Sequence, residues 1–232
     1  VHTLTLNKPA DPEKAQVWAV ALSPSGTSLF VGGRLNAIAR WSLAGSPRRL
    51  PDLRYEYNNN AVRVQALAVS PEGDQLAAGL QGRRVLRWQL SGEHAIAQPQ
   101  IGVEGWTNAI SYSADGGMLL VANSSQNVYL FDPVTGSRKG RLFDAHNVTG
   151  AQWVRNRVVS VEDDGGLRVW QERTIAVPTG SIVYGLAADD HDQFLAATTL
   201  SDDVHLWRRH DQTLEPLAKP DVAGRKVSSA LA

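Results

Sequence analysis

Short apolar runs separated by turn residues recur along this chain, and residues 64–88 show the arrangement most clearly. There the run VQALAV is followed by the turn Ser-Pro-Glu-Gly at 70–73, a second run, QLAAGL, and an alternating segment that ends on Trp88. Apolar runs of this length between Gly, Pro and Ser predict strands, and the short turn between the first two predicts a hairpin. Residues 17–41 repeat the arrangement. The chain is therefore built from a recurring unit of strands.

Five such units follow one another. They lie near residues 17–54, 64–98, 107–143, 148–177 and 183–217. The third strand of each unit ends on an aromatic residue: Trp41, Trp88, Phe131, Trp170 and Trp207. An aliphatic residue stands three positions before each aromatic: Ile38, Val85, Val128, Leu167 and Val204. Successive aromatics are 47, 43, 39 and 37 residues apart, which brackets the period of about 40–45 residues typical of a four-stranded propeller blade.

A lone four-stranded sheet cannot cover both of its faces, but sheets stacked radially around an axis cover one another. The repeat therefore predicts a single all-β propeller over residues 1–232, with five complete four-stranded antiparallel blades. Further short strands are expected at 1–6 and 226–232. Because these flanking strands do not make up a whole blade, the pattern favours a ring of six or seven blades, completed by the rest of a longer chain or by a second chain. A closed five-bladed ring is the alternative.

Two hairpin turns, at 23–26 and 70–73, read Ser-Pro-x-Gly, and most third strands end on Trp. With these motifs the chain resembles the WD-repeat β-propeller family, and the resemblance covers nearly the whole sequence. The family's Trp-Asp pair is matched by Phe131-Asp132 and its Gly-His pair by Ala145-His146. Family members bury a hydrogen-bond network of an Asp, a His, the Trp and a strand serine. In the fourth unit the resemblance assigns these structural roles to Asp164, His146 and Trp170.

Charge and composition narrow the range of partners. Lys+Arg and Asp+Glu both number 23, so the formal net charge is zero, whereas binding to nucleic acid or to an anionic membrane draws on a basic excess. No apolar run approaches the roughly 18 residues of a membrane span. We therefore expect neither a nucleic-acid nor a membrane partner, and a cytoplasmic protein. The chain has no cysteine, which excludes disulfides and thiolate metal sites.

The sequence offers no catalytic constellation. The run that most resembles a metal site is Asp-Asp-His-Asp at 189–192, because oxygen and imidazole groups suit a divalent cation. It occupies the place of a hairpin turn, however, where Asp is favoured for the bonds it makes to its own backbone. Neither a Gly-x-Ser-x-Gly elbow nor a Gly-rich phosphate loop is present. We expect no enzyme activity, no cofactor and no metal; a propeller hydrolase with a metal in its central channel is an alternative.

Positions that vary between units favour binding. One slot in each first strand changes from unit to unit: Trp18, Gln65, Asn108, Thr149 and Tyr184. Loops that lead into the same rim carry Tyr55, Tyr57, Arg63, Trp106 and His146, and the turns between second and third strands carry Arg34, Arg83 and Arg84. Exposed Trp, Tyr and Arg dominate the energetics of protein interfaces. The aromatic residues have an alternative role, since they also suit packing within the rim.

These features predict a non-catalytic protein–protein interaction scaffold or sensor module, which binds a protein partner through the rim loops of the propeller. In the WD-repeat family this rim binds peptides and partner proteins, so the resemblance implies the same. An alternative is that the propeller forms the recognition portion of a larger multidomain signalling or defence protein.

Overall fold

The computed structural model describes residues 16–34, 37–56, 62–125, 127–142, 148–154, 157–170, 175–178, 183–188, 193–199, 204–210 and 213–217. Within these residues every regular element is a β-strand, and no helix is long and apolar enough to cross a membrane. The strands form five four-stranded antiparallel sheets, and strands adjacent in the chain are adjacent in the sheet. We call these sheets blades 1 to 5.

Blade 1 consists of β1 (Val17–Leu22), β2 (Ser28–Gly33), β3 (Ala37–Ser42) and β4 (Arg48–Arg54). Blade 2 consists of β5 (Val64–Val69), β6 (Gln75–Leu80), β7 (Arg84–Ser91) and β8 (His94–Gly102). Blade 3 consists of β9 (Thr107–Tyr112), β10 (Leu119–Asn123), β11 (Asn127–Phe131) and β12 (Arg138–Leu142). Blade 4 consists of β13 (Val148–Val154), β14 (Arg157–Glu162), β15 (Gly166–Trp170) and β16 (Ile175–Pro178). Blade 5 consists of β17 (Val183–Ala188), β18 (Phe194–Thr199), β19 (Val204–His210) and β20 (Thr213–Pro216).

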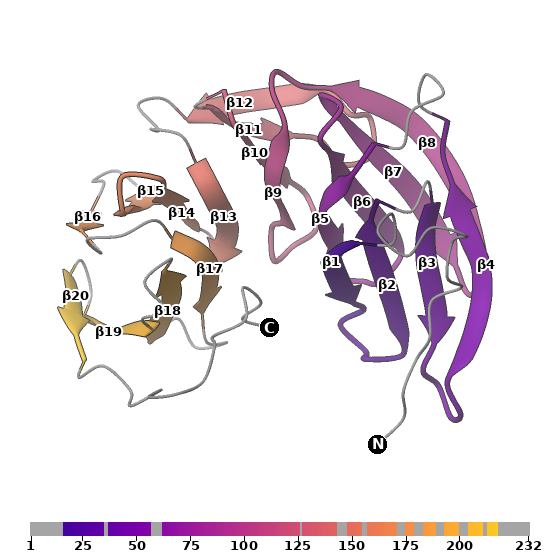
Figure 1. Cartoon of the computed structure of the whole chain (residues 1–232), viewed down its shortest axis with the longest axis horizontal. Coiled ribbons are helices and arrows are strands. Elements are labelled where there is room, and N and C mark those ends of the chain that lie inside the picture. The colour runs from indigo at the N-terminus through magenta and orange to yellow at the C-terminus, as the bar shows by residue number, and fades with distance from the viewer. Residues whose placement is uncertain are drawn as a thin grey trace.

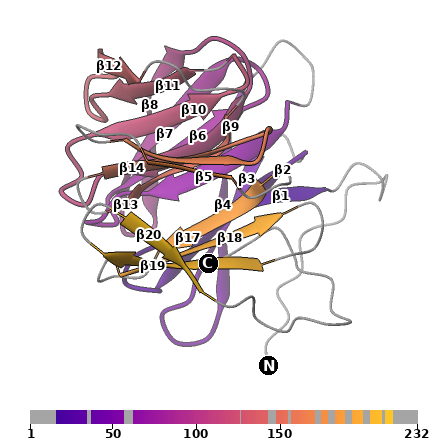
Figure 2. The same cartoon turned by 90° about the vertical axis from the view of Figure 1, so that its left-hand side faces the viewer.

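The predicted fold class, five four-stranded antiparallel blades without helices, is confirmed by these sheets. The blades follow one another around an arc with the first strand of each blade innermost, and blades 1 and 5 stand at its two ends (Figure 1). Figure 2 shows the same blades from the side. The flanking strands expected at 1–6 and 226–232 lie outside the described residues.

A serine organises the first hairpin turn in three blades. In blade 2 the Ser70 hydroxyl accepts the backbone N–H of Gln75 at 2.9 Å, and the Ser70 carbonyl accepts the N–H of Gly73, also at 2.9 Å. Gly73 has a φ of 75°, a conformation that glycine adopts without the penalty of a Cβ. The same bonds form around Ser23 in blade 1 and Ser113 in blade 3. The turn motif of the sequence thus sets where the first strand ends and the second begins.

The two faces of each blade pack against different neighbours. In blade 2, Trp88 lies in an apolar cluster with Ile38 of blade 1, whereas Val85 lies in a cluster with Phe131 of blade 3. The aromatic at the end of the third strand therefore faces the preceding blade, and the aliphatic residue three positions earlier faces the following one. Four of these aliphatics are fully buried: Ile38, Val85, Val128 and Leu167. This two-sided burial explains the regular spacing in the sequence.

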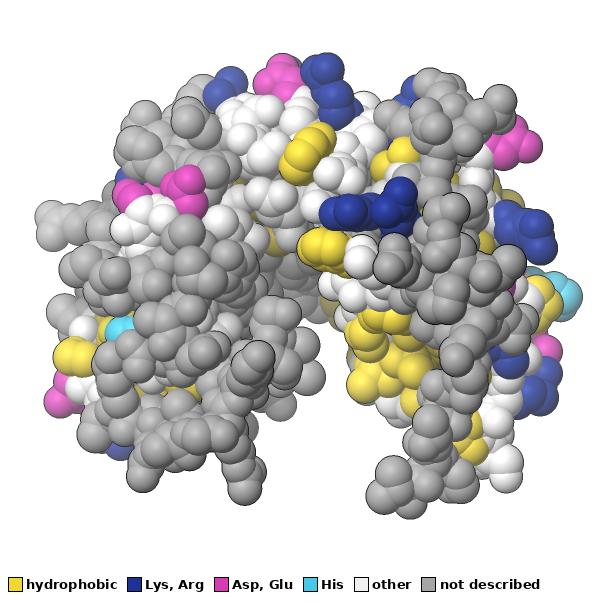
Figure 3. All heavy atoms as spheres, in the orientation of Figure 1, with side chains coloured by type: hydrophobic (Ala, Val, Ile, Leu, Met, Phe, Trp, Pro, Cys, Tyr) yellow, Lys and Arg dark blue, Asp and Glu magenta, His cyan; other side chains and the backbone are white. Residues whose placement is uncertain are grey.

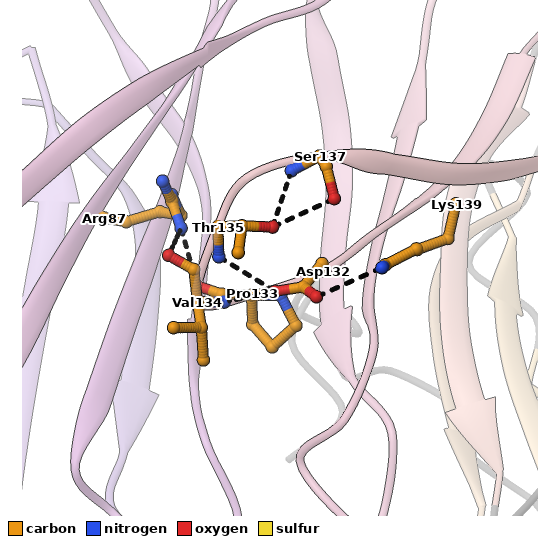
Figure 4. A network of polar contacts seen from close by, with 7 residues as sticks. All are labelled: Arg87, Asp132, Pro133, Val134, Thr135, Ser137 and Lys139. Carbon is orange, nitrogen blue, oxygen red and sulfur yellow. Dashed lines mark hydrogen bonds and ion pairs between the residues drawn. The ribbon is translucent and has the colours of Figure 1, made fainter.

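A buried arginine joins blade 2 to blade 3, and the sequence analysis did not predict it. Arg87, which directly precedes Trp88, is 3% exposed. Its guanidinium donates to the carbonyl of Pro99 in the outer strand of its own blade at 2.7 Å. It also donates across the interface to the carbonyls of Pro133 and Val134, at 2.6 and 3.1 Å (Figure 4). The side chain fixes the third–fourth turn of blade 3 to blade 2.

Blades 1 and 2 are joined in the same way. Arg40, which precedes Trp41 and is 5% exposed, donates to the carbonyl of Pro51 in its own outer strand and to the carbonyl of Glu93 in the third–fourth turn of blade 2. Blade 3 has Leu130 at the equivalent position, and this side chain packs into the apolar cluster toward blade 4. The position before the last aromatic of the third strand therefore contacts the next blade in all three cases, through hydrogen bonds of an arginine or through apolar packing of a leucine.

Candidate functional site

Every first strand contains a β-bulge at its second residue. The pairing with the second strand shifts between Val17 and Ala19 in blade 1, and at the equivalent place in the other four blades. A bulge releases one residue from the ladder and redirects its side chain. The bulged residues are Trp18, Gln65, Asn108, Thr149 and Tyr184. The variable slot of the sequence is thus the bulge of each inner strand.

Four of the bulged residues share one cavity. Trp18, Gln65, Asn108 and Thr149 line a cavity of about 580 Å³ that is bordered by the innermost strands of blades 1 to 4 and by Leu186 of blade 5. The side chain of Tyr184 lies outside the part of the chain that the structure describes. A cavity of this size falls within the range of ligand sites, about 300–1,000 Å³. The bulges thus place Trp18 and Thr149, which are 131 positions apart in the chain, around the same cavity.

Trp18 and Arg63 form a contact between blade 1 and the loop that leads into blade 2. Trp18 is 50% exposed, and the Arg63 guanidinium lies 4.9 Å from the centre of its ring, within the reach of a cation–π interaction. The carbonyl of Arg63 accepts the N–H of Gln81 at 3.0 Å. The loop is therefore held to the turn of blade 2, and it keeps its arginine over an accessible indole.

The other bulged side chains differ in their partners. The Asn108 amide donates to the carbonyl of Val148 in blade 4 at 2.7 Å, and the Thr149 hydroxyl donates to the carbonyl of Val161 at 3.3 Å. These two groups are used in holding blades 3 and 4. The side-chain oxygen of Gln65 is buried without a hydrogen-bond partner among the described residues. Of the four bulged side chains that the structure describes, Trp18 is therefore the one that exposes a large surface to a ligand.

The loops that enter first strands lie at the same edge of the blades as the turns between second and third strands, because neighbouring strands run antiparallel. Direct bonds join the two kinds of segment: the N–H of Ser124 donates to the carbonyl of Trp106, and the N–H of Gln81 to that of Arg63. Most of the rim candidates fall in these segments. At this edge the structure places Trp18, Arg34, Tyr55, Arg63, Arg83, Arg84 and Trp106.

These side chains are not equally available to a partner. The Tyr55 hydroxyl donates to the carbonyl of Val62 at 3.0 Å, and burial raises the pKa of Tyr55 to about 12. Arg84 donates to the side-chain oxygen of Gln100 at 2.9 Å. Trp106 is 49% exposed and Arg83 is also exposed. Among the described candidates, Trp18, Arg83, Arg84 and Trp106 are therefore exposed and Arg34 and Arg63 are half-buried, while Tyr57 and His146 lie outside the described residues.

Of the aromatics expected to be structural, Trp88, Phe131, Trp170 and Trp207 lie between blades, whereas Trp41 packs in a cluster of blade 1 residues. Trp41, Trp88, Phe131 and Trp207 are each at most 4% exposed. Trp170 is half-buried, and its indole N–H donates to the Ser160 hydroxyl at 2.8 Å. Asp164 is exposed and accepts the N–H of Gly166 at 2.8 Å. In the described part of blade 4, the indole of Trp170 thus donates to a serine of the second strand, and Asp164 accepts a bond within its own turn.

The opposite third–fourth turn of blade 3 is shaped by Asp132, which follows Phe131. Its carboxylate accepts the backbone N–H groups of Val134 and Thr135 at 2.9 and 2.8 Å and pairs with Lys139 at 3.3 Å (Figure 4). The bond from Thr135 is the largest cause that lowers the pKa of Asp132, to about 2. This Asp therefore has a local role, which is to present two carbonyls of the turn to Arg87.

An apolar surface lies on blade 1. Figure 3 shows hydrophobic side chains gathered over β1 on the limb that borders the opening of the arc. Val17, Val20 and Leu22 of this strand are 47%, 57% and 54% exposed.

In the described ranges no group of three His, Cys, Asp or Glu is close enough to hold a metal ion. The metal-like run at 189–192 lies outside those ranges.

The stacked four-stranded blades, their serine turns and the bulged inner strands define the fold of a β-propeller. The chain superposes with a TM-score of 0.76 on a chain from the crystal structure of the mitotic checkpoint complex, with 17% identity, covering 91% of this chain and 68% of that one. The WD40 repeats of RRP9 give 0.65 with 15% identity and coverage of 88% and 80%, and U3-55K gives 0.65 with 16% identity and coverage of 88% and 81%.

The predicted resemblance to WD-repeat propellers is confirmed by these superpositions. No protein-family model and no curated protein matches the sequence. At identities of 15–17% the likeness shows the fold and not a shared partner.

Proposed function

We propose that this chain is a non-catalytic recognition module that binds a protein segment at the edge formed by the bulged residues and the loops around Trp18, Arg63 and Trp106. The proposal rests mainly on one observation. The same bulge recurs in five inner strands, and four of the bulged residues, which carry an indole, two amides on chains of different length and a hydroxyl, line a single cavity. A repeated backbone with different residues at one slot suits recognition, because the scaffold stays constant while the contacts change.

The energetics of the exposed groups support a protein partner. An aromatic side chain contributes about 150–250 Å² of buried surface when it is covered, and Trp18 and Trp106 both leave half of their surface accessible. The backbone bonds of Arg63 and Trp106 to neighbouring turns hold their loops in place, so binding orders little of the chain. The zero formal net charge also favours a protein over nucleic acid or an anionic membrane.

Site-specific crosslinking tests where a partner binds. A photoreactive phenylalanine analogue replaces Trp106 in the full-length gene product, and in a matched variant it replaces Glu72, which lies in a hairpin turn at the opposite edge of the blades. After irradiation in the source cell, we expect protein adducts from position 106 that are absent from position 72. Adducts of the same proteins from both positions would contradict the proposed face.

A titration of the identified partner then tests the contact itself. We expect Trp18→Ala to weaken its binding about tenfold or more, because a central aromatic carries a large share of interface energy. Ile96→Ala is the control, since Ile96 is 66% exposed on the outer strand of blade 2. Equal affinities for the wild type and Trp18→Ala would contradict the proposal.

A further inference from the structure

A second pocket lies away from the bulged residues, between the outer parts of blades 2 and 3. Its volume is about 720 Å³. One wall comes from the end of β8 and the segment that follows it, and the other comes from β11, β12 and the turn between them. None of the residues that line the cavity at the bulges contributes to this pocket. Arg83, which lines it, also stands at the edge proposed for a protein partner, but Trp18 and the other bulged residues take no part in it.

The floor of the pocket is apolar and rigid. Ile101, Val103 and Phe131 line it, and they are 5%, 9% and 4% exposed because they also belong to the core between the two blades. Gly102 also lines the pocket, and it is exposed. A preformed, mostly apolar floor of this kind is typical of sites for small molecules.

The rim of the pocket is mainly cationic. Arg83 of blade 2 and Arg138 of blade 3 both line it, and both are exposed. The one lining carboxylate, Glu104, already accepts hydrogen bonds from the Tyr129 hydroxyl at 3.0 Å and from the Asn127 amide at 3.4 Å. Two guanidinium groups and one engaged carboxylate leave a site that attracts anions. Guanidinium groups are well suited to carboxylate and phosphate because they donate two parallel hydrogen bonds.

Arg83 also has an unusual backbone conformation. Its φ is 60°, and within the described ranges it is the only residue other than glycine with a positive φ. Side-chain-bearing residues rarely adopt this conformation, and where they do it is often at a functional site. The Arg83 carbonyl accepts the N–H of Val103 at 3.0 Å. The turn is therefore tied to the floor of the pocket while its arginine lines the rim.

We propose that this pocket binds a small organic anion with a flat apolar body, the body resting on Ile101 and Phe131 and the anionic group bonding to Arg83 and Arg138. The shared chemistry is a carboxylate or phosphate next to an apolar ring, and the charge of the rim decides against a neutral ligand. A WD-repeat propeller would thereby carry a small-molecule site on its perimeter in addition to the edge used for proteins.

Calorimetric titration with two isosteric probes tests the proposal. The probes are naphthalene-2-carboxylate and the neutral naphthalene-2-carboxamide. We expect the carboxylate to bind the wild type with a Kd below about 1 mM and the amide to bind about tenfold more weakly, because the amide loses the charge-assisted bonds. Arg138→Gln should weaken carboxylate binding about tenfold, whereas Arg54→Gln, which removes an exposed positive charge from blade 1, should leave it unchanged.

Replacing both arginines tests the location. Arg83→Gln combined with Arg138→Gln should abolish binding of the carboxylate, because both guanidinium groups that line the pocket are lost. Both side chains are exposed, so the melting temperature should stay close to that of the wild type. No binding to the wild type, equal affinities for the two probes, or unchanged binding to the double variant would each overturn the proposal. Trp18→Ala should not affect the titration, which separates this site from the protein-binding edge.

Discussion

At the scale of single residues, a few polar side chains decide how one blade is held to the next. Arg87 is the clearest case, because a buried guanidinium is costly unless its donors are used. Burial lowers its pKa, an effect that the nearby Tyr112 and Asp132 oppose. Its bonds reach Pro99 in its own blade and two carbonyls in blade 3. Such a residue contributes mainly through the groups that its removal would leave without partners.

We expect Arg87→Met to lower the free energy of unfolding by about 3 kcal/mol or more, because the Pro133 carbonyl loses its donor while staying buried and those of Pro99 and Val134 lose theirs in partly buried places. Urea denaturation followed by tryptophan fluorescence measures the change. Arg48→Met is the control: Arg48 forms an ion pair with Glu93 but both side chains are more than half exposed, so the cost should stay below about 1 kcal/mol. Similar losses for the two variants would show that the bonds across the interface contribute little.

Asp132 gives stability a dependence on pH. Its pKa is about 2 in the folded protein and about 3.9 in an unfolded chain. Because the folded value is the lower one, the ionised carboxylate stabilises the fold. This contribution is complete above about pH 5 and is lost as the pH falls through the folded value. Carbon NMR of the carboxyl should give the low pKa, and the stability lost in Asp132→Asn should be larger at pH 6 than at pH 2. A pKa near 3.9 would contradict the turn geometry.

The sequence predicts some of these residues and not others. The variable slot at Trp18 and its equivalents could be found because the strands around it align, but a pattern of residue types does not reveal a bulge. The arginine contacts have a counterpart in the sequence. In the first two units an Arg directly precedes the Trp, and a proline follows that Arg 11 or 12 residues later, in the outer strand. The signal is weak because Leu130 fills the same role in blade 3 by apolar packing.

At the scale of elements, the second strands of blades 1 and 2 carry a glycine where any side chain would collide with the next blade. A Cβ atom at Gly79 would lie 2.7 Å from the Cβ of Thr107, the first residue of the next blade. Gly32 stands in the same relation to Val64. Glycine at these positions therefore sets the distance between inner strands, and through it the width of the cavity that the bulged residues line.

We expect Gly79→Ala to lower the free energy of unfolding by about 1–3 kcal/mol, because the added methyl overpacks the interface between blades 2 and 3. Gly102→Ala is the matched control. It adds the same methyl to the same blade in open space, so stability should be unchanged or increase by about 0.5 kcal/mol through the unfolded state. Thermal unfolding of both variants gives the comparison. If Gly79→Ala is as stable as Gly102→Ala, the close approach is not a constraint.

Strands were the most predictable elements, since apolar runs and Ser-Pro-x-Gly turns fix their ends. The outer strands were less so: the fourth strand of the second unit was expected to end near 98, and β8 continues to Gly102. Most of its residues are exposed and only Ile101 is buried, which gives the sequence little apolar periodicity to show. The pocket proposed between blades 2 and 3 depends on this extension, and for that reason the sequence did not reveal it.

At the scale of the whole molecule, the stability of stacked blades is a sum of terms between neighbours. Leu67 and Val69 of blade 2 pack against the core that this blade shares with blade 1. The equivalent residues of blade 1, Val20 and Leu22, are more than half exposed (Figure 3). The same strand motif therefore contributes differently according to its place in the arc. No sequence pattern could show this, because the repeats are alike and only their neighbours differ.

Two leucines in equivalent strands test this dependence on position. We expect Leu67→Ala to lower the free energy of unfolding by about 1–3 kcal/mol, since its side chain packs against blade 1. Leu22→Ala, in the strand at the end of the arc, should change it by no more than about 0.5 kcal/mol. Urea denaturation of both variants measures the difference. A loss for Leu22→Ala as large as that for Leu67→Ala would mean that blade 1 is covered in solution on the face that the arc leaves open, and its side chains would then have to be assigned to an interface.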